Sequence, residues 1–180
     1  MAAVVEIKRW TGLAAGPTKD IITSINTRAN AEDTNTPDGT TNSILIPAGG
    51  SNYSYWVETR LYVTSISLGT VDNLRWYSDG TNNFGTDVTC VGYSAAGYVQ
   101  ATGTPGTTGD PLTKASGSLR EEPVDVFGLK VGSPLSLTGT TIATGDFGDF
   151  FVYQIVVGST AVSGATAAET FTWKYDDTSS

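Results

Sequence analysis

Apolar and polar side chains alternate strictly along residues 53–64. One face of this stretch carries Tyr53, Tyr55, Val57, Thr59, Leu61 and Val63. The other face carries Ser54, Trp56, Glu58, Arg60, Tyr62 and Thr64. Because successive side chains of a β-strand point to opposite faces, this alternation predicts a half-buried strand. A second run of strand character, residues 73–80, follows after a short link that contains Gly69.

Shorter runs rich in β-branched and aromatic residues occur along the rest of the chain. They lie at residues 4–10, 21–25, 43–47, 84–92, 93–102, 124–131, 135–142, 150–157 and 169–175. Gly, Pro and Asn separate most of them, and these residues favour turns. We expect roughly eight to ten short strands from this spacing. Residues 119–122 are the one place where we allow a short helical turn.

Two runs near the C-terminus have a distinct character. Residues 150–157 form the most apolar stretch of the chain, which is typical of a central strand covered on both faces. Residues 169–175 place Phe171, Trp173 and Tyr175 on one face, with polar residues on the other. Both runs therefore predict strands of a packed core.

The pattern as a whole predicts an all-β fold, a single β-sandwich of jelly-roll type. No window supports an amphipathic helix of ordinary length, and no repeat of 20 to 50 residues is visible. The 180 residues are enough for one domain with its own core. We divide that domain into N-terminal strands and loops, residues 1–43, considered as an attachment arm, and a sandwich body, residues 44–180.

Charge and apolar content narrow the classes of partner. Ten basic residues stand against 18 acidic ones, a net charge of −8, so neither nucleic acid nor an anionic membrane is an expected partner. No apolar run approaches the about 18 residues that a membrane-spanning helix needs. The basic residues near the N-terminus follow a very short apolar run, the wrong order for a signal peptide. We expect synthesis in a cytoplasm.

The chain lacks the side chains on which most enzymatic sites depend. It has no histidine, which excludes Ser-His-Asp and Cys-His catalysis, and its one cysteine, Cys90, is expected to be a buried structural thiol. No phosphate-binding glycine motif is present. The glutamates considered for carboxylate chemistry, Glu58, Glu121, Glu122 and Glu169, are not paired by any pattern in the sequence. We therefore predict no catalytic residue, no cofactor and no enzymatic activity.

Calcium is the metal to consider separately, because it needs only oxygen ligands. Asp146 and Asp149 are expected in a turn before the apolar strand. Further aspartates fall in expected loops or ends, at Asp72, Asp79, Asp110, Asp176 and Asp177. No EF-hand spacing is present, and turn aspartates commonly bond nearby backbone N–H groups. We favour this turn-forming interpretation and predict no metal site, with calcium binding by an acidic loop as the alternative.

The aromatic residues admit two interpretations. Trp10, Trp56, Trp76 and Trp173, with eight tyrosines, could form a sugar-binding platform. The same positions would also be filled in a sandwich core or an intersubunit interface. We favour the core or interface, and expect Trp56 and Trp76 to be buried.

Several segments resemble a group of structural proteins of tailed phages. The first two are Ile44-Leu45-Ile46-Pro47-Ala48-Gly49-Gly50-Ser51-Asn52-Tyr53-Ser54-Tyr55-Trp56 and Asn73-Leu74-Arg75-Trp76-Tyr77-Ser78-Asp79-Gly80. The others are residues 97–103 with 108–109, and Tyr153-Gln154-Ile155-Val156-Val157 followed by Phe171-Thr172-Trp173-Lys174-Tyr175-Asp176. Together they span residues 44–177. The resemblance implies a virion component with a sandwich fold and carries over no catalytic residue.

The resemblance implies that the chain functions as a capsid decoration (cement) protein, which binds and stabilises an assembled phage head. Its expected partner is the major capsid protein, its expected location is the virion, and a homo-oligomer, with a trimer as the default, is expected from capsid symmetry. The N-terminal segment and the loop 103–111 are the candidates for contact with the shell. Two alternatives stay open: a tail or baseplate accessory protein, and a carbohydrate-binding or host-adhesion module.

Overall fold

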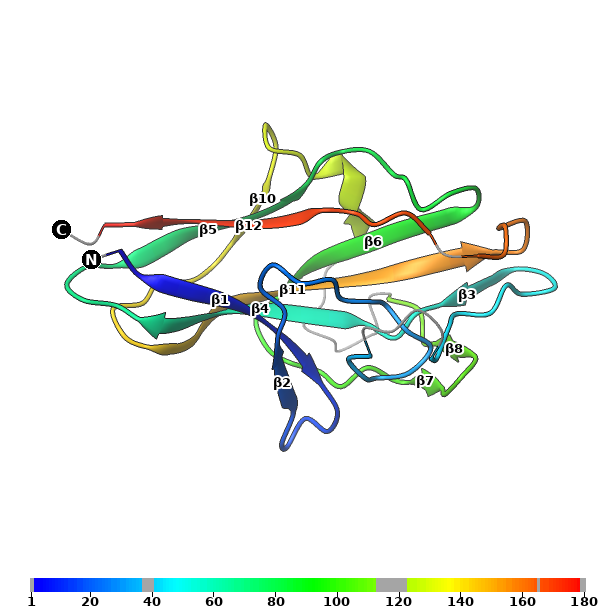
Figure 1. The fold of residues 1–180 in the computed structure, drawn as a ribbon, viewed down its shortest axis with the longest axis horizontal. Coiled ribbons are helices and arrows are strands. Elements are labelled where there is room, and N and C mark those ends of the chain that lie inside the picture. Colours follow the sequence, from blue (N-terminus) through cyan, green and yellow to red (C-terminus); the bar gives the residue numbers. More distant parts are fainter. Residues whose placement is uncertain (1, 37–40, 113–122, 165, 179–180) are drawn as a thin grey trace.

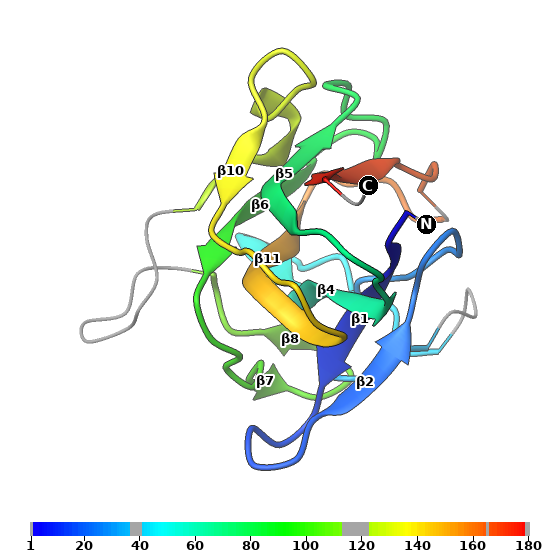
Figure 2. The same cartoon turned by 90° about the vertical axis from the view of Figure 1, so that its left-hand side faces the viewer.

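The computed structural model describes residues 2–36, 41–112, 123–164 and 166–178, which fold into two antiparallel sheets packed face to face (Figures 1 and 2). The large sheet has the order β2 (Thr18–Ile21), β1 (Val4–Thr11), β4 (Val57–Ser65), β11 (Gly145–Gly158), β6 (Val88–Ala95) and β9 (Val124–Asp125). β3 (Ser51–Tyr53) pairs with β11 beyond the start of β4. The all-β sandwich that the alternation predicts is confirmed.

The small sheet has the order β10 (Leu135–Leu137), β5 (Val71–Ser78) and β12 (Phe171–Asp177). A short hairpin, β7 (Gly103–Thr104) with β8 (Thr108–Gly109), lies on the side of the large sheet away from the small one (Figure 2). A 3₁₀ turn, Val126–Gly128, directly follows β9. Asp125 caps this turn by accepting a hydrogen bond from the Phe127 N–H at 3.0 Å.

The core between the sheets is built from the faces that the alternation assigns. Trp76 of β5 is 1% exposed and stacks on Phe151 of β11, with ring centroids 3.6 Å apart. Phe171, Trp173 and Tyr175 of β12 pack against the same core, as predicted. Cys90 is buried among these residues, and burial raises the pKa of its thiol well above the ordinary value. The interpretation of Cys90 as a structural thiol is confirmed.

β11 is the central strand and is covered on both faces, as its apolar run predicts. Phe151, Tyr153 and Ile155 point into the core between the sheets, whereas Phe150 and Val152 belong to a second, smaller cluster on the outer face. That second cluster also contains Tyr93, Ala95 and Leu112, and Trp10, Trp56, Val91 and Tyr98 pack against it. The large sheet therefore buries side chains on its inner and outer faces alike.

Several predicted strands are placed differently by the structure. The run from residue 53 is interrupted after β3, because the Tyr55 N–H bonds to the Asn30 carbonyl of a loop and β4 begins only at Val57. The two strands predicted in 84–102 are one strand, β6. Residues 98–101 leave the sheet, and the Val99 N–H bonds to the Glu58 carboxylate instead.

Four other predicted strands are absent or have different boundaries in the structure. Residues 43–47 form no strand, and the predicted strand 124–131 is the short β9 followed by the 3₁₀ turn. The strand predicted at 21–25 lies earlier, at β2, and the one predicted at 135–142 is reduced to β10. The helical turn considered at 119–122 lies outside the described residues.

The N-terminal residues belong to the sandwich. β1 pairs with β4 along residues 4–10 and with β2 along residues 8–11. The Val5 and Ile7 side chains pack against the core between the sheets. Residues 4–21, considered above within an attachment arm, thus contribute two strands of the large sheet. Deleting residues 1–12 would remove a strand that lies between two others.

Candidate functional site

Two loops meet beside the outer face of the large sheet and form the candidate site. We call residues 22–36 and 96–112 together the loop platform. The Gly106 N–H bonds to the Ala31 carbonyl at 2.9 Å, which joins the two loops directly. The turn after β1 is hydrogen-bonded to both loops. The Gly12 N–H donates to Asp33 of the first loop, and the Tyr98 hydroxyl of the second loop donates to the Gly12 carbonyl. The loops therefore hold one another in place.

Gln154 ties the platform to the central strand. Its side chain is fully buried on the outer face of β11. The Nε2 group donates to the Ser54 carbonyl at 2.6 Å and to the Asp110 carbonyl at 2.9 Å, and Oε1 accepts from the Leu112 N–H at 2.6 Å. One amide thus satisfies three backbone groups from two distant segments, which fixes where the loop ends.

Two more side chains anchor the second loop of the platform. Glu58 of β4 is 1% exposed, and its carboxylate accepts a hydrogen bond from the Val99 N–H at 3.3 Å. The Trp56 indole donates to the Asp110 carbonyl at 3.0 Å. Trp56 is only partly buried, so the expectation that it is buried is wrong, whereas the same expectation for Trp76 is confirmed.

Arg9 is a buried cation beside the first loop of the platform. Its guanidinium Nη1 donates to the Arg28 carbonyl and to the Thr27 hydroxyl, the latter at 3.1 Å. Nε and Nη2 are buried and donate no hydrogen bond to any of the described residues. Burial lowers the pKa of Arg9. Sequence reasoning missed this residue, because a charged side chain in an alternating strand is ordinarily interpreted as facing solvent.

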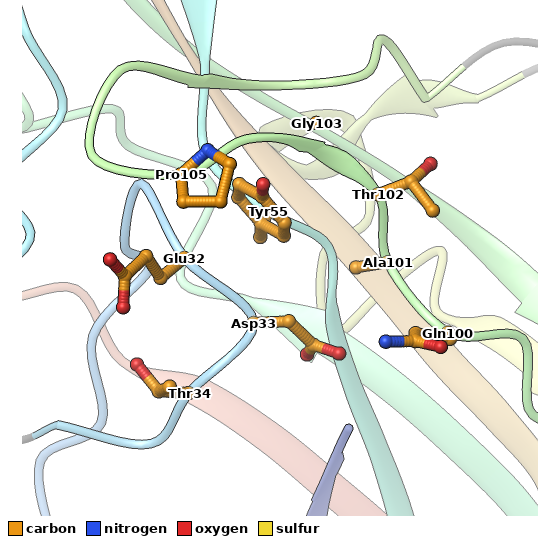
Figure 3. A pocket seen from close by; sticks show the side chains of 9 residues that line it. All are labelled: Glu32, Asp33, Thr34, Tyr55, Gln100, Ala101, Thr102, Gly103 and Pro105. Atoms are coloured by element: carbon orange, nitrogen blue, oxygen red, sulfur yellow. The ribbon is translucent and has the colours of Figure 1, made fainter. Parts of the chain in front are cut away.

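A pocket of about 440 Å³ lies between the two loops of the platform (Figure 3). Its lining residues are Glu32, Asp33, Thr34, Tyr55, Gln100, Ala101, Thr102, Gly103 and Pro105. The acids come from the first loop and the amide and hydroxyl groups of Gln100 and Thr102 from the second. The pocket offers hydrogen-bond acceptors and negative charge. Its lining contains neither histidine, cysteine nor lysine.

Burial and charge shift two pKa values in this pocket. Burial raises the pKa of Asp33, and the Gly12 N–H and the Arg9 charge only partly oppose that effect. Burial also raises the pKa of Tyr55, and the charges of Asp110, Glu32 and Asp33 raise it further. The Asp33 shift therefore reports loss of water around the carboxylate, and the Tyr55 shift reports burial together with nearby acidic groups.

The two described glutamates that were considered for catalysis have separate structural roles. Glu58 holds the platform, and Glu169, before β12, accepts from the Asn83 N–H. Glu121 and Glu122 lie outside the described residues. Neither Glu58 nor Glu169 lines the pocket described above.

Most of the aspartates considered for calcium form hydrogen bonds or ion pairs with other residues of the chain. Asp146 and Asp149 lie within β11, not in a turn before it: Asp146 forms an ion pair with Lys19 at 2.7 Å, and Asp149 accepts from the Thr138 N–H at 3.0 Å. Asp79 accepts from the Thr81 N–H two residues on, as a turn aspartate does. Within residues 2–36, 41–112, 123–164 and 166–178, no group of three or more His, Cys, Asp or Glu residues could hold a metal ion.

Comparison with known proteins adds no relative. No protein-family model, no curated protein and no solved structure matches this chain. In the part of the chain that the structure describes, no helix is both long and apolar enough to cross a membrane.

Proposed function

We propose that this protein is a decoration protein of a tailed-phage head, which binds the assembled capsid and stabilises it. The observation that supports this proposal best is the meeting of the phage-like segments at one place. Ser54, Gly109 and Gln154 come from three separate resembling segments, and Ser54 contacts both of the others beneath the loop platform. The segments thus form one structural unit, in which a rigid sandwich presents two loops.

The mechanism is one of mass action. A protein that binds only the assembled shell lowers the free energy of that state by its own binding free energy. The major capsid protein is the partner, and the decoration protein acts as a symmetric oligomer, with a trimer proposed for shells that offer three-fold positions. The loop platform, which contains residues 103–111, takes the place of the N-terminal segment as the surface proposed to contact the shell.

Separated heads and tails from the phage test this function. We expect the protein to co-purify with heads, at high copy number by quantitative mass spectrometry, and to rebind stripped heads in a sedimentation assay. Stripped heads should release their DNA at a lower temperature than decorated ones. Recovery with tails alone would contradict the proposal and support a tail or baseplate accessory protein.

A glycan array tests the third alternative. Trp76 is stacked within the core, so it offers no surface to a sugar. Trp56 is partly exposed and remains the aromatic residue to substitute. Glycan binding that is lost in Trp56→Ala, with the fold intact by circular dichroism, would favour a carbohydrate-binding module over the proposed decoration protein.

A further inference from the structure

The pocket of the loop platform has the size and the composition of a binding site for one positively charged group. Its volume of about 440 Å³ lies within the range of about 300–1,000 Å³ that is common for ligand sites. Two adjacent acidic residues, Glu32 and Asp33, form one wall, and no basic residue lines it. In Figure 3 the Asp33 and Gln100 side chains extend toward one another across the pocket.

Each carboxylate is held in place by a neutral donor through one of its oxygens. The Asn42 side chain donates to Glu32 Oε2 at 2.8 Å, and the Gly12 N–H donates to Asp33 Oδ2 at 2.8 Å. Neutral donors fix the direction of a carboxylate but leave its charge in place. The wall is therefore preorganised to meet a cation, at little further cost in side-chain entropy.

Two oxygen atoms of this wall lack a partner. Asp33 Oδ1 and Thr34 Oγ1 are both buried, and neither forms a hydrogen bond within the described part of the chain. A buried carboxylate oxygen without a donor is costly, and an opposite charge nearby offsets that cost. Burial is the main cause of the raised pKa values of both Asp33 and Tyr55, and for Tyr55 the nearby acidic charges add to it.

We propose that this pocket binds an arginine or lysine side chain from the surface of a partner protein. Either side chain supplies positive charge together with several N–H donors, and arginine presents them in a planar fork that suits paired carboxylates. That the cation belongs to a protein surface rests on the function proposed above. The preference for a cation rests on the pocket alone.

Two other occupants fit the pocket less well. Calcium takes six to eight oxygen ligands, and the described residues bring no three carboxylates together. A neutral sugar would bring no positive charge to the two carboxylates, and the Tyr55 ring, 4% exposed, offers it no stacking face. Calcium is an outcome of the experiment below, and the glycan array described above tests a sugar.

The full chain, labelled with ¹⁵N, is titrated with N-acetyl-arginine amide and with N-acetyl-lysine amide and followed by NMR. N-acetyl-citrulline amide, which has nearly the shape of the arginine probe without its charge, is the control ligand. We expect saturable shifts of the backbone amides of residues 32–34 and 100–103 with the cationic probes only. Glu32→Gln keeps an acceptor for Asn42 and should weaken binding about fivefold or more, the difference between a charged and a neutral hydrogen bond.

Asp79→Asn is the matched control variant, because it removes an exposed acid that bonds only within its own turn and should bind the probes as the wild type does. The inference is overturned if neither cationic probe shifts these amides, if citrulline shifts them equally, or if Glu32→Gln binds as tightly as Asp79→Asn. Saturable shifts with calcium chloride alone would assign a metal site instead.

This titration uses no phage heads, so its result separates the two proposals. Failure of the cationic probes rejects the pocket inference and leaves the head-binding assay to decide the proposed function. Binding of the probes by a protein that does not bind heads retains the pocket and rejects the decoration function.

Discussion

The two faces of the large sheet are held by different kinds of contact. The inner face packs apolar and aromatic side chains against the small sheet, with Trp76 stacked on Phe151 at its centre. The outer face has a smaller apolar cluster and relies on the buried polar groups of Gln154 and Glu58 to bind loops. The inner face thus supplies most of the burial, whereas the outer face determines where the loops lie.

This difference has a physical basis. Apolar burial is non-directional and scales with the area removed from water, so it stabilises a fold without specifying the position of a loop. Hydrogen bonds have strict geometry, and a buried group that loses its partner is destabilised. Hydrogen bonds therefore hold a surface loop in one conformation better than apolar contacts do.

The largest expected effect is on the inner face. Trp76→Ala should lower the free energy of unfolding by about 3–5 kcal/mol, because it removes a fully buried aromatic side chain and leaves a cavity. Denaturant titration measures this loss. Trp56→Ala, on the outer face and only partly buried, is the matched variant and should cost clearly less. Equal losses would contradict the assignment of the inner face as the main source of stability.

A second experiment compares adjacent residues of β11 that point to opposite faces. Gln154→Leu leaves the Ser54 and Asp110 carbonyls and the Leu112 N–H without their partner, and should cost about 1–3 kcal/mol. Ile155→Val, on the inner face, should cost about 0.5–1.5 kcal/mol.

The two variants should differ in hydrogen exchange more than in stability. In Gln154→Leu the amides of residues 108–112 should exchange faster relative to the core, because that end of the loop platform is no longer anchored. In Ile155→Val their exchange should change only as much as global stability does. The same local change in both variants would show that Gln154 does not act on the loop specifically.

A third experiment concerns the close approach of Gly109 to Ser54. A Cβ at Gly109 would collide with the Ser54 carbonyl oxygen, so Gly109→Ala should displace the β7–β8 hairpin and cost about 1–3 kcal/mol, at the lower end if the hairpin can move. Gly97→Ala, in the same loop but in open space, is the control and should leave stability nearly unchanged. A thermal melt compares them. Equal melting temperatures would mean that the hairpin is held loosely.

The sequence predicted the burial of a strand correctly where the pattern of side chains within that strand was sufficient. Alternation identified the faces of β4 and β12, and continuous apolarity identified β11 as covered on both sides. It failed at residues 54–56 and 98–101. There the Tyr55 and Val99 N–H groups bond to Asn30 and Glu58, 25 and 41 positions away, and leave the strand pattern. Boundaries set by such partners have no local signature.

The candidate site was the least predictable part. Nothing near Glu32 and Asp33 in the sequence indicates that they face residues 100–105, because the two segments are joined only through the fold. Arg9 and Gln154 belong to residue types that are mostly exposed in proteins, yet both are fully buried.

By itself, then, the sequence determined that this chain is an all-β sandwich with an aromatic core, because side-chain periodicity within a strand records which face is buried. The tertiary structure alone decided which loops meet, which polar groups are buried and where the acidic pocket forms. Those features depend on hydrogen bonds between residues far apart in the chain, such as Gln154 and Ser54, separated by 100 positions. Periodicity within one strand carries no information about such pairs.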